Sequence, residues 1–160
     1  KGTVLADDMG ILDNDFTINN NKIGYVPQDV FLINGSILSN IALGDINQDI
    51  DKQNLNLAIK VAGLEKIFDK NKNINLKTEI FDKGHNLSGG QKQRIGIARA
   101  LYRKPSLLIL DEATNQIENK TKLEIIRELK IVYKNMTTII VSHDNSVIDF
   151  CDYIINLNKK

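Results

Sequence analysis

Apolar and polar positions follow two periods along this chain, one typical of strands and one typical of helices. Short apolar runs bounded by turn residues predict strands at residues 3–5, 10–12, 22–26, 107–110, 137–141 and 153–157. Apolar residues three and four apart predict helices at residues 36–42, 53–62, 89–103, 118–133 and 145–150. In the second half of the chain, strands alternate with helices. That order indicates an α/β fold with a mainly parallel sheet.

Several segments carry more detailed signals. Residues 107–110 and 137–141 are continuous apolar runs, which predicts buried strands, the first of them covered on both faces. Ser88 is a good N-cap for the helix at residues 89–103, while the Asn- and Lys-rich residues 70–86 predict a loop. The inward-facing candidates of the helix at residues 118–133 are Leu123, Ile126, Leu129 and Ile131.

Polar side chains follow three predicted strands at their carboxyl ends: Gln28, then the pair Asp111-Glu112, then His143. In open α/β sheets the ligand lies outside the carboxyl ends of the strands. One carboxylate can hold Mg²⁺ and the other can polarise a water, while an imidazole can contact a phosphate. Each signal alone also fits a structural reading, namely an acidic turn that caps the next helix or a structural histidine. Together they predict one site at this edge.

The helix that starts after Ser88 adds a second kind of signal. Ser88, Gly89 and Gly90 open a helix whose first turns carry basic residues. A helix N-terminus presents free N–H groups and a partial positive charge, which favours an anion such as phosphate.

Four motifs together are very specific. The stretches LSGGQKQR, LLILDEAT, YVPQ and IIVSHD closely resemble the signature, Walker B, Q-loop and switch-histidine motifs of the ATP-binding cassette (ABC) transporter ATPases, in matching order and spacing. The resemblance implies a P-loop NTPase fold with a parallel core sheet and a helical subdomain. It further implies a single incomplete domain over residues 1–160, with the helical subdomain at about residues 30–85 and the core sheet region at 1–29 and 86–160.

The resemblance also implies roles for the residues at the strand ends, with ATP and Mg²⁺ as cofactors. Asp111 would hold Mg²⁺, and Gln28 would link the metal and the water to a membrane partner. Glu112 would orient and deprotonate the attacking water, and His143 would bind the γ-phosphate.

The signature motif would act on a different nucleotide. In the family, the residues that correspond to Ser88, Gly89, Gly90 and Gln91 bind the ATP held by a second ABC ATPase domain. The resemblance therefore implies a head-to-tail dimer of two such domains.

Two stretches, VPQDVFLINGSILSNI and TEIFDKGHNLSGGQ, are similar to exporter-type members of the family, with Asp82 where an acidic residue is usual. In exporters these regions receive the cytoplasmic helices of the membrane domain. The apolar residues 29–43 then form a surface to be covered, although ordinary core packing also accounts for part of their apolarity. The resemblance implies a transmembrane domain upstream in the same polypeptide and a location at the cytoplasmic face of the inner membrane.

Two features depart from the family pattern. The chain contains no Gly-Lys pair and therefore no P-loop motif G-x-x-x-x-G-K-[ST]. We therefore expect Lys1 to lie downstream of the P-loop strand and helix, and the chain alone to be inactive and to bind ATP poorly. The loop after Walker B reads Asn115-Gln116-Ile117-Glu118, where the family usually has serine, alanine, leucine and aspartate.

Composition narrows the remaining classes. A net charge of +1 argues against a nucleic-acid partner. Cys151 has no second cysteine to pair with, so we expect a small buried residue. The alternatives are a soluble ABC-type ATPase that acts on DNA or ribosomes, and a regulatory module without activity of its own. The first gives no reason for the exporter-like stretches, and the second would describe the fragment but not the whole protein.

Overall fold

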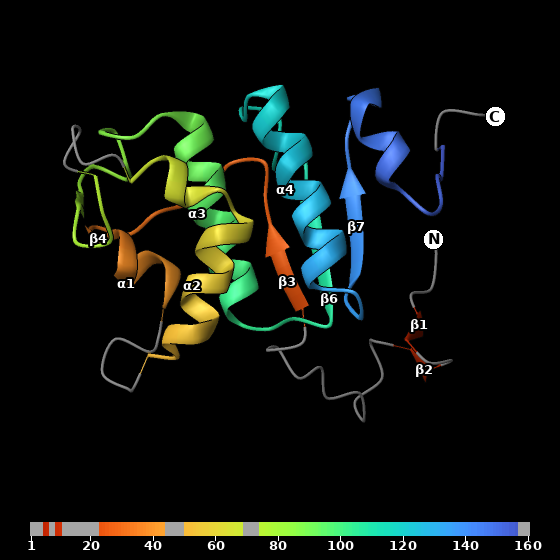
Figure 1. Ribbon diagram of the computed structural model, residues 1–160, viewed down its shortest axis with the longest axis horizontal. Helices are drawn as coiled ribbons and strands as arrows, with labels where there is room; N and C mark the ends of the chain where they lie inside the picture. The colour runs from red at the N-terminus through yellow and green to blue at the C-terminus, as the bar shows by residue number, and fades with distance from the viewer. Residues whose placement is uncertain (1–4, 7–8, 11–22, 44–49, 69–73, 157–160) are drawn as a thin grey trace.

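A computed structural model describes residues 5–6, 9–10, 23–43, 50–68 and 74–156 of the chain (Figure 1). Its elements follow in the order β1 (Leu5–Ala6), β2 (Met9–Gly10), β3 (Ile23–Val26), β4 (Gly35–Ser36), α1 (Ile37–Ile41), α2 (Lys52–Val61), η2 (Leu64–Lys66), β5 (Glu79–Ile80), α3 (Gly89–Tyr102), β6 (Leu107–Asp111), α4 (Asn119–Val132), β7 (Thr137–Val141) and η4 (Asn145–Phe150). The elements η2 and η4 are 3₁₀ turns.

The central sheet consists of β3, β6 and β7 in the order β3-β6-β7, and all three strands are parallel. Val26 lies opposite Leu110, and Asp111 lies opposite Val141. The carboxyl ends of the three strands therefore meet at one edge of the sheet. The predicted α/β fold with a parallel sheet is confirmed.

Local sequence explains where the helices begin and end. Ser88 caps α3 in a capping box with Gln91, and the Asp51 side chain caps α2. Each such cap contributes about 1 kcal/mol to helix stability. Gly63 follows α2 with a φ of 66°, a conformation that glycine adopts without strain, so the helix ends there.

The two faces of the central sheet differ. On one face, which we call the covered face, Val26, Leu108 and Leu110 are fully buried in a core that also holds side chains of α3 and α4. On the opposite face, the open face, Tyr25 is 54% exposed and Ile139 is 47% exposed. Residues 107–110 were expected to be buried on both faces, but Leu107 and Ile109 are only half-buried. Residues 137–141 were expected to be buried, but they alternate between exposed and half-buried. Both expectations were wrong, because apolar content alone does not reveal which face is covered.

Other expectations also differ from the structure. The segment at residues 70–86 contains β5, which pairs antiparallel with β4. Residues 153–156 form no strand and are exposed. Ile131 is exposed, and Ile125 takes an inward position, because α4 is rotated relative to the expected face. Leu123 and Cys151 are half-buried.

The first two strands form an antiparallel pair, β1 with β2. The predicted strands at residues 3–5 and 10–12 each share one residue with this pair, and the rest of both ranges lies outside the described residues. Helices α1 and α2 pack against α3, which in turn packs against β3. Among the described residues, no helix has the length and apolarity needed to cross a membrane.

Candidate functional site

Asp111 is the last residue of β6, at the edge where the three carboxyl ends meet. Its Oδ2 atom accepts a hydrogen bond of 2.9 Å from the hydroxyl of Tyr25 on β3. This bond raises the pKa of Tyr25, because the phenolate form would be repelled by the carboxylate. Tyr25 was not singled out in the sequence, since a tyrosine in a strand is usually a packing residue.

Glu112 and His143 come together from adjacent strand ends. His143 Nε2 lies 3.0 Å from Glu112 Oε1, and Asn115 Nδ2 donates to Glu112 Oε2 at 3.1 Å. The backbone of Glu112 has a φ of 50°, and its N–H donates to Val141 O at 3.0 Å. Both carboxylate oxygens of Glu112 thus have partners. One of these partners is Asn115, the first residue of the loop that departs from the family sequence.

Gln28 is exposed after β3, and its contact to the rest of the site runs through its backbone. The buried side chain of Gln93 on α3 donates to Gln28 O at 3.5 Å and accepts from Gln116 N at 2.9 Å. A cavity of about 360 Å³ lies between these segments, lined by Gln28, Asp29, Val30, Gly89, Lys92, Gln93 and Gln116. Gln93 therefore joins the loop after β3 to the loop after β6, a role that its place inside a helix did not reveal.

The signature turn is exposed at Ser88, and its two polar side chains serve the helix itself. Ser88 N donates to Gln91 Oε1 at 2.7 Å, and Gln91 N donates to Ser88 Oγ at 3.3 Å. The two glycines lie against Gln116: a Cβ on Gly89 would be 1.5 Å from Gln116 Oε1, and one on Gly90 would be 2.7 Å from Gln116 O. At Gly90 the absence of a Cβ lets the backbone of Gln116 come close, whereas at Gly89 the space is filled by the Gln116 side chain.

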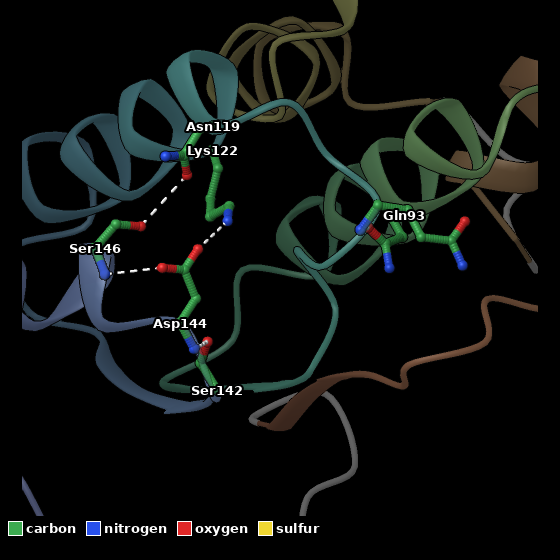
Figure 2. Close-up of polar contacts among 7 residues, drawn as sticks. Gln93, Asn119, Lys122, Ser142, Asp144 and Ser146 are labelled. Carbon is green, nitrogen blue, oxygen red and sulfur yellow. Dashed lines mark hydrogen bonds and ion pairs between the residues drawn. The ribbon is translucent and has the colours of Figure 1, made fainter.

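The loop after β7, which carries His143, is fixed to α4 (Figure 2). Lys122 on α4 forms an ion pair with Asp144, the residue after His143. Asp144 Oδ1 accepts from Ser146 N at 2.8 Å, and Asp144 N donates to Ser142 Oγ at 3.0 Å. Lys122 is buried, which is uncommon for a lysine. In the sequence, its burial is indicated by its spacing of three, four and seven residues from inward positions of α4.

The arrangement can orient a water and contact an anion at the sheet edge. Glu112 offers a carboxylate within reach of an imidazole, and Asp111 offers a second carboxylate with one oxygen beyond its bond to Tyr25. Within the part of the chain that the structure describes, no three acidic, histidine or cysteine side chains converge to enclose a metal ion. Mg²⁺ usually takes only one or two protein carboxylates and fills its other positions with water and phosphate oxygens, so this donor set fits it.

Comparison with known proteins agrees with the sequence motifs. Residues 1–115 match the ABC transporter family. The chain is 37% identical to an export ATP-binding/permease protein of Rickettsia typhi and 35% identical to the ATP-dependent lipid A-core flippase 2 of Colwellia psychrerythraea; each match covers 99% of this chain and 27% of the relative. It spans about a quarter of the length of these relatives.

A solved structure shares the fold. The structure of a bacterial Atm1-family ABC exporter with ATP bound superimposes with a TM-score of 0.81 and 32% sequence identity, covering 92% of this chain and 26% of the exporter. The two relatives named above are described as an export ATP-binding/permease protein and as a flippase, which disfavours a soluble ATPase that acts on DNA or ribosomes. The motifs, the parallel sheet and these matches together identify the chain as a member of the ABC transporter family.

Proposed function

We propose that this chain is the nucleotide-binding domain of an ABC exporter, in which hydrolysis of MgATP is coupled to transport across a membrane. The observation that carries the proposal is the convergence of Glu112 and His143, whose side chains come from different strands and lie 3.0 Å apart. The exporters among the relatives support it.

Glu112 is the general base in this proposal. Its carboxylate takes a proton from the attacking water, and His143 beside it binds the γ-phosphate. Asp111 and Gln28 would hold Mg²⁺, which neutralises charge on the phosphates when it is bound. Asn115 and His143 each contact one oxygen of the Glu112 carboxylate, which limits the orientations that the base can take.

Ser88, Gly89, Gly90 and Gln91 would bind the nucleotide of a second ABC ATPase domain in a head-to-tail dimer. Two observations support this assignment: the turn is exposed at Ser88, and the first N–H groups of α3, a helix of 14 residues, lie at this end. Backbone N–H groups at such a helix start favour an anion. The side chains of Ser88 and Gln91 are engaged in the cap, so the backbone would supply most of the contact.

The membrane domain would contact a surface formed by residues 28–36 and 79–84. Phe31 and Phe81 are both exposed there, and the segments are adjacent because β4 pairs with β5. Lys83 Nζ lies 6.0 Å from the centroid of the Phe31 ring. Arg99 holds the first segment to α3, with hydrogen bonds to Phe31 O at 2.9 Å and to Asn40 O at 2.7 Å. We place this surface at the cytoplasmic face of the membrane, with the transmembrane domain upstream in the same polypeptide.

The test is Glu112→Gln in the full-length polypeptide that contains this chain, reconstituted in lipid vesicles. General-base catalysis contributes roughly 10²–10⁴-fold, so we expect ATP turnover to fall by that factor while MgATP binding is retained. Glu65→Gln, an exposed glutamate in η2, is the matched control and should keep normal turnover. Normal turnover in Glu112→Gln would contradict the role of Glu112.

A further inference from the structure

A buried lysine holds α4 against the loop that carries His143. The Lys122 side chain is only 7% exposed, and its ammonium group pairs with Asp144. The lysines in three other ion pairs, Lys66, Lys104 and Lys130, are 53% to 64% exposed. Among these four, Lys122 alone has its charge largely removed from water.

Asp144 receives hydrogen bonds at both carboxylate oxygens. Lys122 bonds to Oδ2, and the backbone N–H of Ser146 bonds to Oδ1. The Lys122 hydrogen bond, followed by those from Ser146, lowers the pKa of Asp144 to about 2. Ser146 Oγ also lies 3.4 Å from Asn119 Oδ1, which gives the loop a second contact with the start of α4 (Figure 2).

A pair of this kind fixes geometry more than it adds stability. Removing a lysine from water has a large desolvation cost, which a carboxylate in good geometry roughly offsets. If the loop moved away, Lys122 would be left as a buried charge without its partner, which is strongly unfavourable. Positions of the loop in which Asp144 leaves Lys122 are therefore disfavoured.

His143 needs such a constraint because packing does not supply one. Its side chain is 84% exposed and contacts Glu112 at the sheet edge. Asp144 is the next residue along the chain, so the position of its backbone sets that of His143. We propose that Lys122 and Asp144 are positioning residues, whose ion pair holds the loop after β7 so that His143 Nε2 stays beside Glu112 Oε1. This inference rests on the proposed function, because it concerns the same site.

The first experiment compares single substitutions in the reconstituted full-length protein. Lys122→Met removes the charge and keeps the length of the side chain, and Asp144→Asn keeps an acceptor for the Ser146 N–H. A misplaced catalytic group costs up to about 100-fold, so we expect each variant to lower kcat roughly 10- to 100-fold. The KM for MgATP should stay within about twofold, because the loop acts on the chemical step.

Lys130→Met is the matched control, because Lys130 lies on the same helix and pairs with Asp152 at the surface. It should leave kcat unchanged. A merely structural role for Lys122 would lower the melting temperature while the folded fraction kept normal kcat. Normal kcat in Lys122→Met and Asp144→Asn, or an equal loss in Lys130→Met, would overturn the inference.

The second experiment exchanges the charges. Lys122→Glu and Asp144→Lys alone should each be at least as slow as Lys122→Met, and the double variant should recover most of the lost kcat. A double variant no faster than its parents overturns the inference. If wild-type protein hydrolyses ATP and Glu112→Gln does not, while Lys122→Met is normal, this inference alone fails; if wild-type protein hydrolyses no ATP, the proposed function fails with it.

Discussion

Both faces of the central sheet carry apolar side chains, but these are buried on one face and partly exposed on the other. Val26, Leu108 and Leu110 on the covered face have no appreciable exposure, whereas Tyr25 and Ile139 on the open face are about half exposed. Parallel sheets are normally covered on both faces. We infer from the comparison that packing on the covered face holds the three strands in place and so fixes the positions of their carboxyl ends.

The site draws on the open face and on the loops that follow the strands. Asp111 continues the open-face alternation of β6, two residues after Ile109, which lies opposite Tyr25. The Tyr25 hydroxyl therefore reaches the Asp111 carboxylate as a diagonal neighbour on that face. Glu112 departs from the strand with a positive φ and turns toward His143. Asp111 and Glu112 are thus consecutive residues, but the carboxylate of the first is held at the open face and that of the second by the loops.

The largest expected difference between the faces is in stability. Leu110→Ala would leave a cavity in the covered face and should lower the free energy of unfolding by about 2–5 kcal/mol. Ile139→Ala on the open face should lower it by less than about 1 kcal/mol. Urea unfolding of the nucleotide-binding domain, followed by circular dichroism, measures both. Equal losses would show that the open face is covered in solution.

A second comparison concerns the two glycines at the start of α3, one packed against backbone and the other against a side chain. Gly90→Ala would push a Cβ against the backbone oxygen of Gln116, so we expect a loss of about 1–3 kcal/mol. In Gly89→Ala the short contacts are with the end of the Gln116 side chain, which can rotate away, while Gln116 Cβ lies at 3.3 Å; alanine also favours helix. It should therefore be neutral or stabilising. Thermal unfolding of the two variants tests this, and the reverse order would contradict the placement of Gln116.

The smallest expected effect concerns β7, where the covered face is only half-buried and the Lys122–Asp144 pair lies nearby. Because the pKa of Asp144 falls from 3.8 to about 2 on folding, the stability from this carboxylate is complete above about pH 4 and is lost as the pH falls through about 2. Asp144→Asn should therefore be less stable than wild type near neutral pH, and the difference should shrink toward pH 2.

The measurement is the free energy of unfolding between about pH 2 and pH 6 for both proteins. Lys122→Met removes the main cause of the shift and should weaken the pH dependence in the same way. A difference between Asp144→Asn and wild type that stays constant down to pH 2 would show that the pair is not formed.

Local patterns predicted the parts of the fold that local forces determine. The cap at Ser88 and the stop at Gly63 gave the limits of α3 and α2, and apolar runs gave the three central strands. Strand β5 was missed because two residues in a polar segment show no periodicity, and their partner strand lies more than 40 residues away.

The strand expected at residues 153–157 failed for the opposite reason: Tyr153, Ile154 and Ile155 are apolar, but their described segment forms no strand. The site divides in the same way. Motif order predicted Asp111, Glu112 and His143 as site residues. The contacts from Tyr25 to Asp111 and between Lys122 and Asp144 join residues far apart in sequence, and no single stretch encodes them.

The positive φ of Glu112 sets a condition on any mutational survey of this position. Such a backbone is tolerated by glycine and, to a lesser degree, by asparagine and aspartate, while β-branched residues resist it. Valine or isoleucine at position 112 would thus damage the turn as well as remove the carboxylate. Inactive variants there separate into those that lose only the acid and those that also misfold the bend, and glycine compared with valine distinguishes the two groups.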